Sequence, residues 1–573
     1  MAYRSGHIER RLRALAAGLG VRTLAACATV PREAAEAPAA REQVQILALN
    51  DFHGNLEVPA GTTTYTAGGQ QQRETLGGAA RLGSTLTRLR EGHANTVTVA
   101  AGDLIGGSPL VSAYYLDEPT IMALNRMGLD LASVGNHEFD KGTAELTRMQ
   151  RGGCEAHTRR QPCRLDNPFE GAKFTYLAAN VVAEATGQTL FPGTAIRQFG
   201  NARIGFIGMT LKDTGSLVSP AGTAGFRFDD EAETANRLAA ELKAQGADAV
   251  VVLIHQGGDV DPFYNQDGCP QLGGDVMPIL ARLDPAIRLV VSGHTHKAYI
   301  CEVPAADGST RLLTSAGRYG YFVTDIRLTI DPATDRVEAL SAVNTPVVAA
   351  AGEQADIAAL VGRYSADSAS VATRVVGRID GSLETIDGQI DAPLARLVAD
   401  AALAATRAPA QGGAELAFIN SGGVRTAFRP AADGSVTYGQ IFALQPFGNT
   451  VEVLELTGAQ LKQLIEQEFT ADGTGQFRQS FLIPSNGFAY AIDRSRPDGQ
   501  HVVAMTLDGQ PVDPARSYRV AVNNFLAQGG DGFTVLLDGR FLAGGQSDLD
   551  ALEAFIADGA AASSEARVTE VRR

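Results

Sequence analysis

Short apolar runs alternate with longer amphipathic stretches from position 44 onward. The runs VQILAL (44–49), TVTVAA (96–101), LDLASV (129–134), AVVVLI (249–254) and IRLVVS (287–292) have the length and composition of buried strands. Segments with helical spacing, such as AARLGSTLTRLR (79–90) and ETANRLAAELKAQ (233–245), lie between them. Strands that are apolar on both faces and alternate with helices are typical of layered α/β domains.

A second α/β region follows a connecting stretch. Residues 346–375 combine a helical pattern with small polar residues and predict a linker helix. Beyond it, LARLVADAALAAT (394–406) predicts a helix, AELAFIN (414–420) a strand, VEVLELTGAQLKQLIEQEF (451–469) a strand then a helix, and YRVAVNNF (518–525) a strand. A chain of 573 residues needs more than one core. We therefore expect a leader and arm at 1–41, a domain at 42–345, the linker at 346–375 and a smaller α/β domain at 376–565.

Composition narrows the choice of partners. The formal net charge of −15 argues against nucleic acid or an anionic membrane as a partner, because both would repel the chain. Local cationic side chains could still bind a small anionic substrate. No apolar run approaches the roughly 18 residues that cross a bilayer, so we expect a soluble mature chain.

The N-terminus has the order of an export signal. Arg4, Arg10, Arg11 and Arg13 precede the apolar segment ALAAGLGV, and RTLAAC then ends at Cys27. The last four residues resemble a bacterial lipobox, which would place a lipid on Cys27, although Arg22 interrupts the apolar segment. We expect a periplasmic or cell-envelope location, with this lipid as the one link to a membrane. The alternative is a disordered arm.

Four cysteines remain after Cys27, and their even number fits an oxidising compartment. Three pairings are open, and we favour Cys154 with Cys163 and Cys269 with Cys301. The first would close a short polar loop, GGCEAHTRRQPC. The alternative is four buried thiols.

Each of the five early strands ends in residues that can bind a metal ion. They are Asp51 and His53 after the first strand, Asp103 after the second, Asn136 and His137 after the third, His255 after the fourth, and His294 and His296 after the fifth. Ligands of open α/β sheets bind beyond the carboxyl ends of the strands, so these side chains should converge. A lone His or Asp is more often a core or capping residue, but five of the nine histidines fall at these strand ends.

The convergent residues suit two metal ions better than one. Imidazole, carboxylate and amide ligands fit Zn²⁺, Mn²⁺ or Co²⁺, and the candidates exceed what one ion needs. Two ions about 3.5–4 Å apart can activate a bridging hydroxide and clamp both ends of an in-line displacement at phosphorus.

The motifs DFHGN, GD, GNHEFD, the lone His255 and SGHTH, in that order, resemble the calcineurin-like metallophosphoesterase superfamily. The resemblance implies a layered β-sandwich flanked by helices. It also implies one metal held by Asp51, His53, Asp103 and His296, and a second held by Asp103, Asn136, His255 and His294. His137, oriented by Asp140, would then stabilise the phosphoryl group and protonate the leaving oxygen. Glu138, in the same motif, has no role in this scheme.

Three later motifs, NSGGVR (420–425), QPFGN (445–449) and FLAQGGDGF (525–533), resemble the C-terminal domain of the 5'-nucleotidase family. The resemblance implies that Phe447 and Phe525 sandwich a nucleobase, Asp531 binds ribose, Asn449 contacts the base edge and Arg425 binds phosphate. The alternative is glycine turns and core phenylalanines. One departure is SLETIDGQID (382–391), where the family commonly carries further phosphate-binding arginines.

These features lead us to expect an exported dimetal phosphohydrolase that acts on 5'-nucleotides or nucleotide diphosphate-sugars. Three alternatives stay open at this point: a 2',3'-cyclic phosphodiesterase with 3'-nucleotidase activity, a thiosulfohydrolase-like enzyme, and a non-catalytic surface lipoprotein that captures metal or nucleotide. The sequence does not predict an oligomeric state.

Overall fold

The computed structural model describes residues 41–571, except 159, 219, 332, 335, 380–382, 384–391, 470–480, 560–562 and 564. The predicted export signal and the lipidation of Cys27 lie outside these residues. So does the segment SLETIDGQID, apart from Leu383. Within the described residues, no helix is both long enough and apolar enough to cross a membrane.

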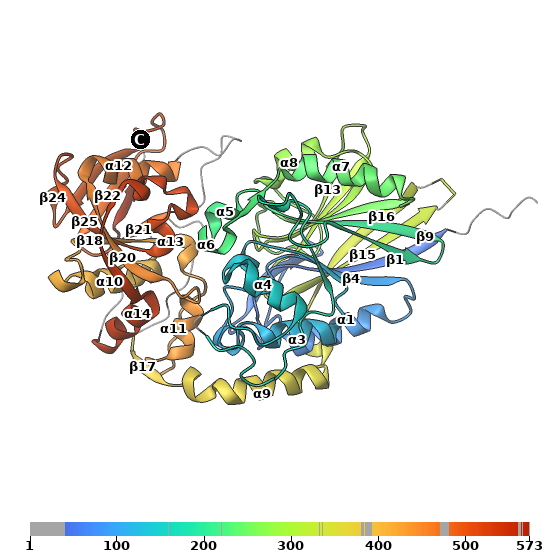
Figure 1. Cartoon of the computed structure of the whole chain (residues 1–573), viewed down its shortest axis with the longest axis horizontal. Helices are drawn as coiled ribbons and strands as arrows, with labels where there is room; N and C mark the ends of the chain where they lie inside the picture. The colour runs from blue at the N-terminus through green and yellow to red at the C-terminus, as the bar shows by residue number, and fades with distance from the viewer. Residues whose placement is uncertain are drawn as a thin grey trace, which may run out of the picture. The chain divides into compact units, whose positions relative to one another are not determined.

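Two six-stranded sheets form the β-sandwich in the described part of the N-terminal half (Figure 1). The first sheet has the order β16 (Arg336–Pro346), β15 (Phe322–Asp331), β1 (Glu42–Leu49), β4 (Thr96–Ala101), β5 (Leu131–Ser133) and β6 (Thr175–Leu177). The second has the order β13 (Ala298–Pro304), β14 (Thr310–Ala316), β12 (Ile287–Ser292), β11 (Ala249–His255), β9 (Ala202–Thr210) and β8 (Thr194–Phe199). The predicted strands β1, β4 and β5 are parallel neighbours in one sheet, and β11 and β12 are parallel neighbours in the other.

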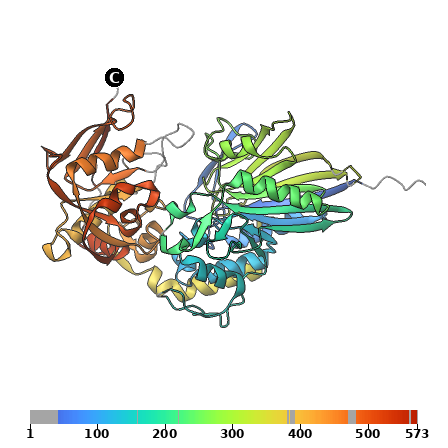
Figure 2. The same cartoon turned by 45° about the horizontal axis from the view of Figure 1, so that its top comes forward.

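The five predicted strands of the sandwich, β1, β4, β5, β11 and β12, are buried on both faces, which explains their continuous apolar runs. From β1, Val44 and Ile46 pack between the two sheets against β11 residues such as Val251. The intervening Leu47 faces the helices instead. Helices α1 (Ala79–Arg90), α3 (Glu118–Met127) and α4 (Gly142–Arg151) pack on the first sheet, and α7 (Glu231–Ala244) and α8 (Val276–Arg282) cover the second (Figure 2). The layered sandwich expected from the sequence is confirmed.

A long helix, α9 (Ala355–Ala372), forms inside the predicted linker. It is anchored to the N-terminal core, because Ile357, Leu360 and Tyr364 are buried in the same cluster as α1 and α3. The chain leaves this helix to enter the C-terminal half through β17 (Val375–Arg378).

The C-terminal half is a smaller α/β structure, as predicted. Its five-stranded sheet has the order β21 (Leu482–Pro484), β18 (Leu416–Asn420), β25 (Ser517–Asn523), β20 (Thr450–Thr457) and β26 (Arg540–Ser547). A four-stranded sheet has the order β24 (Gln510–Pro511), β23 (Val502–Leu507), β22 (Phe488–Ile492) and β27 (Val568–Glu570). Helices α10 (Pro393–Thr406), α11 (Tyr438–Leu444), α12 (Gly458–Glu466) and α14 (Asp548–Ala557) accompany them. Thr457 and Gln460 form a capping box that starts α12 directly after β20.

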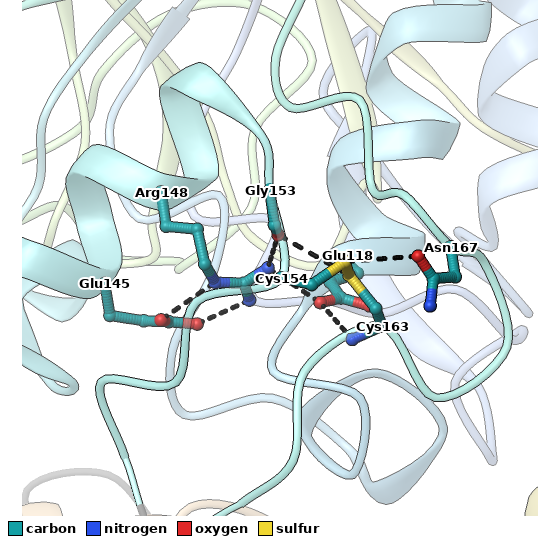
Figure 3. The surroundings of a disulfide bond; sticks show 7 residues. All are labelled: Glu118, Glu145, Arg148, Gly153, Cys154, Cys163 and Asn167. Carbon is teal, nitrogen blue, oxygen red and sulfur yellow. Dashed lines mark hydrogen bonds and ion pairs between the residues drawn. A yellow bond between two sulfur atoms is a disulfide. The ribbon is translucent and has the colours of Figure 1, made fainter.

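The disulfide predicted between Cys154 and Cys163 is present (Figure 3). It is tied to the helices beneath it, because the Cys163 backbone N–H donates to Glu118 at 3.0 Å. The guanidinium of Arg148 joins Glu118, Glu145 and the carbonyl of Gly153 into one buried network. The short disulfide loop is thereby attached to α3 and α4.

The second predicted disulfide is not formed, and this part of the prediction was wrong. Of the cysteines in the described chain, Cys269 and Cys301 are free thiols. They are nevertheless neighbours: a hydrogen bond between the two thiols lowers the pKa of Cys269 and raises that of Cys301. An even number of cysteines is compatible with disulfides, but it does not distinguish a disulfide from a hydrogen-bonded pair of thiols.

Candidate metal centre and active site

The turns that follow the five predicted strands meet at one end of the sandwich. Several of their residues adopt backbone angles that are uncommon outside glycine. The φ angles are 49° at Asp51, 45° at His53, 50° at Asp103, 73° at His294 and 61° at His296. These sharp turns direct successive side chains into one buried cluster, and such strained positions are typical of functional sites.

Two groups of potential metal ligands result. The first contains Asp51, His53 and His296, and the second contains Asp103, His255 and His294. In the first group, His296 Nε2 lies 3.2 Å from His53 Nε2 and 3.4 Å from Asp51 Oδ1. In the second, Asn136 Oδ1 lies 3.1 Å from both His255 Nε2 and His294 Nδ1.

Asp103 lies between the two groups. Its Oδ2 is 3.0 Å from His255 Nε2 and 3.6 Å from His53 Nε2. Gly135 makes this arrangement sterically feasible, since a Cβ there would lie 2.2 Å from Asp103 Oδ1. The position of Asp103 suits a carboxylate that two cations share.

The donor set fits divalent metal ions. Bonds of about 2.0–2.2 Å to nitrogen and oxygen leave neighbouring ligands roughly 3–3.5 Å apart, which matches these separations. The Nδ1 atoms of His53 and His255 lie 2.8 Å from the carbonyls of Gly106 and Ala101, so each Nε2 can carry the lone pair that a metal needs. Burial lowers the pKa of His53, His294 and His296, which keeps these imidazoles neutral.

His137 lies beside the ligand groups and pairs with Asp140. Its Nδ1 is 3.0 Å from Asp140 Oδ2, which also accepts the Gly107 N–H at 3.2 Å. Burial disfavours the imidazolium form of His137, but Asp140 and Asp103 outweigh burial and raise its pKa. A histidine in this setting can hold a proton for a leaving group.

Two of the five predicted substrate residues from the C-terminal half reach the metal centre. Arg425 Nη2 lies 3.2 Å from His53 Nε2. The Phe447 ring stacks on His137, with centroids 5.6 Å apart and 16° between the planes, and Arg425 lies 5.5 Å from the centre of the same phenylalanine ring. A guanidinium and an aromatic ring therefore border the metal ligands.

The other three predicted substrate residues are held by local contacts in the C-terminal half. Asp531 accepts a hydrogen bond from Asn420 at 2.8 Å. Phe525 lies on Gly530, where a Cβ would come within 2.5 Å of the ring. The Asn449 side chain hydrogen-bonds to Asp548, whose pKa is raised by burial to about 7. Among the described rings, Phe447 stacks on His137 and makes no contact with Phe525.

Sequence reasoning missed two neighbours of the first ligand group. Asn50 Nδ2 donates to Asp51 Oδ2 at 2.7 Å and so orients this carboxylate. The Tyr319 ring lies 6.0 Å from that of His53 and 5.9 Å from that of His296. Tyr319 follows β14, the parallel neighbour of β12, so the rule that collected the other strand ends could also have found it.

Comparisons with known proteins agree with this architecture. A model of calcineurin-like phosphoesterases matches residues 44–298, and a model of the 5'-nucleotidase C-terminal domain matches residues 375–538. The crystal structure of a 5'-nucleotidase precursor from Thermus thermophilus superposes with a TM-score of 0.76 at 26% identity, covering 93% of this chain and 100% of that one.

Two curated bacterial proteins are similar along most of this chain. Endonuclease YhcR of Bacillus subtilis is 29% identical over 510 residues, or 86% of this chain and 37% of YhcR. Cell wall protein Lmo0130 of Listeria monocytogenes is 29% identical over 581 residues, or 96% of this chain and 71% of Lmo0130. This chain thus spans well under half the length of YhcR.

The sandwich fold, with its two groups of carboxylate and imidazole ligands, defines a metal-dependent phosphoester hydrolase of the calcineurin-like class. Because the C-terminal half matches as well, the chain belongs to the 5'-nucleotidase family.

Proposed function

We propose that this protein is an exported hydrolase that uses two divalent metal ions to release phosphate from 5'-nucleotides or nucleotide diphosphate-sugars. The observation that carries the proposal is the position of Arg425 and Phe447, which come from the C-terminal half and border His53 and His137. A phosphate-binding cation and a flat apolar surface are the two features that a nucleotide requires next to a hydrolytic centre.

The residues divide the chemistry among them. Asp51, His53 and His296 would hold one metal, Asn136, His255 and His294 would hold the other, and Asp103 would be shared. Bound ions of this kind neutralise phosphate charge and activate water for attack. Zn²⁺, Mn²⁺ and Co²⁺ all suit the ligand set.

The chain's own groups then position the substrate and move the proton. The planar guanidinium of Arg425 would donate hydrogen bonds to two non-bridging oxygens of the phosphate. His137, kept protonated by Asp140, would donate its proton to the departing ester oxygen.

Base recognition would need a rearrangement of Phe447. Its ring covers His137 in this structure, so stacking a base between Phe447 and Phe525 requires the ring to leave the imidazole. We propose domains at 42–345 and 376–565, joined by the linker at 346–375. Hinge motion around this linker would replace the contact of Phe447 with His137 by a contact of Phe447 with the base. Asn449 and Asp531 would then contact the base edge and the ribose.

An envelope location is part of the proposal. The disulfide between Cys154 and Cys163 fits an oxidising compartment, and the similar Listeria protein is named a cell wall protein. Mass spectrometry of the mature N-terminus tests both export and a lipid on Cys27. An intact Met1 in the secreted fraction would contradict export.

The experiment that tests the function is a substrate panel. Purified protein, loaded separately with Mn²⁺, Zn²⁺ or Co²⁺, is assayed for phosphate release from nucleoside 5'-monophosphates and for hydrolysis of nucleotide diphosphate-sugars. Turnover of either group supports the proposal. Turnover of only 2',3'-cyclic nucleotides or of a sulfur ester would contradict it, as would binding of metal and nucleotide without hydrolysis.

A further inference from the structure

Glu138 is buried within the active-site motif, yet it belongs to neither ligand group. Only 2% of the residue is exposed. It follows the ligand Asn136 and the catalytic candidate His137 directly, and Asp140 comes two residues later. A carboxylate is costly to bury unless hydrogen bonds or cations compensate it, so its contacts require an explanation.

The Glu138 side chain accepts three backbone hydrogen bonds from two different strand ends. Its Oε2 accepts from the N–H of Asp103 at 2.9 Å and from that of Gly135 at 2.7 Å. Its Oε1 accepts from the N–H of Leu104 at 2.8 Å. The carboxylate therefore joins the end of β4 to the end of β5.

These bonds act on the turn that carries the shared ligand. Asp103 has a φ of 50°, in the left-handed region that residues other than glycine seldom adopt, so hydrogen bonds to its backbone help to hold this conformation. Asp103 Oδ1 in turn accepts the backbone N–H of His137 at 2.8 Å. Glu138 thus holds the Asp103 backbone, and Asp103 holds the backbone of His137.

We propose that Glu138 is a positioning residue that fixes Asp103 as the ligand common to both metals. This inference rests on the dinuclear centre of the proposed function. Both carboxylate oxygens are needed, because three N–H groups point at them. Glutamine offers only one acceptor oxygen and would turn an NH₂ donor toward another donor.

The test compares Glu138→Gln with Glu231→Gln. Glu231 is a matched control: it is also buried in the N-terminal half, at the start of α7, and accepts the backbone N–H of Lys212 at 2.7 Å. Mn²⁺ binding to each metal-free protein is measured by equilibrium dialysis. Electron paramagnetic resonance of the Mn²⁺-loaded proteins then reports whether two ions are magnetically coupled through a shared ligand.

We expect about 10–100-fold weaker Mn²⁺ binding and loss of the coupled signal in Glu138→Gln, as is usual for outer partners of metal ligands. Glu231→Gln should keep wild-type Mn²⁺ affinity and the coupled signal, whatever its effect on thermal stability. Equal affinity and an unchanged signal in Glu138→Gln would overturn the inference. A wild-type protein that binds fewer than two ions would instead overturn the dinuclear centre itself.

Glu138→Asp decides the question if the glutamine variant does not fold. It keeps the charge but is one methylene shorter, so it cannot reach all three N–H groups. We expect its Mn²⁺ affinity to fall between that of the wild type and that of the ligand-deleted variant Asp103→Ala. Wild-type affinity together with a wild-type coupled signal would overturn the inference.

Discussion

Three adjacent residues, Asn136, His137 and Glu138, have three different environments. Asn136 faces the second ligand group, His137 faces Asp140 and Phe447, and Glu138 faces backbone N–H groups. The chain forms a short 3₁₀ turn at His137–Phe139, so the side chains of the three residues point in different directions. Local geometry therefore places a candidate metal ligand, a candidate proton donor and a buried hydrogen-bond acceptor within one motif.

The role of His137 can be tested by substitution with asparagine. We expect His137→Asn to lower kcat by about 10²–10⁴-fold, because the leaving oxygen loses its proton donor. Metal content should stay at the wild-type level, since His137 belongs to neither ligand group. Phosphate release and elemental analysis measure the two effects.

His157 provides the matched control. It lies in the disulfide loop, where its nearest ionic partner is Glu155 at 3.7 Å. His157→Asn should leave both turnover and metal content unchanged. Wild-type kcat in His137→Asn would show that another group protonates the leaving oxygen.

The candidate metal ligands could be predicted because each one follows a strongly apolar strand. For the candidate substrate residues, the sequence predicts the kind of side chain but not its contacts. Nothing in the order of residues shows that Phe447 stacks on His137, or that Asn449 bonds to Asp548, because these contacts depend on tertiary packing. Glu138 could be given no role from the sequence because its hydrogen-bond partners are backbone N–H groups, which carry no signal in the sequence.

Among the helices and strands, those with a long amphipathic pattern or a continuous apolar run have bounds close to those that the sequence predicts. Helix α1 occupies the predicted residues 79–90, and β4 the predicted residues 96–101. The short strand β5 covers only Leu131–Ser133 of the six-residue run LDLASV. The sequence also could not distinguish the thiol pair of Cys269 and Cys301 from a disulfide.

The disulfide that is present should contribute measurably to stability. Its cysteines are 9 positions apart, and closing a loop of this length restricts the unfolded chain by about 2–3 kcal/mol. We expect the free energy of unfolding of the double variant Cys154→Ser, Cys163→Ser to be lower than that of the wild type by this amount. Urea unfolding without reductant measures the difference. Reductant should shift the wild type toward the variant and leave the variant unchanged. Identical urea curves for the two proteins without reductant would refute this prediction.

Glu468, in the 3₁₀ turn Gln467–Phe469 that follows α12, predicts a pH dependence of stability. Glu468 is buried and accepts from the Leu482 N–H at 2.8 Å, and burial raises its pKa from 4.5 to about 8. Between these values the folded protein binds the extra proton, so this residue's contribution to the free energy of unfolding falls as pH rises. Glu468→Gln removes the titrating group and keeps an acceptor oxygen.

We therefore expect the stability of Glu468→Gln relative to the wild type to increase with pH, by at most about 1.4 kcal/mol per pH unit. Thermal unfolding followed by circular dichroism at pH 5 to 9 measures this difference. Parallel curves for the two proteins would show that Glu468 does not titrate in this window.

On the scale of the whole molecule, the active site combines two halves of the chain. The candidate metal ligands come from the ends of five strands in the N-terminal half, and Arg425 and Phe447 come from the C-terminal half. The formal net charge of −15 repels polyanions in general, whereas Arg425 supplies local positive charge at the site. This contrast favours a small phosphate ester over a long nucleic acid.

If the proposed function is correct, two metal ions held by these candidate ligands are required for hydrolysis of a nucleotide. The most direct measurement titrates metal-free protein with Mn²⁺ and follows phosphate release from a nucleoside 5'-monophosphate at each step. We expect negligible turnover without metal and a rise that reaches its plateau at about two equivalents per chain. Full turnover without metal, or a plateau at one equivalent, would contradict the proposed function.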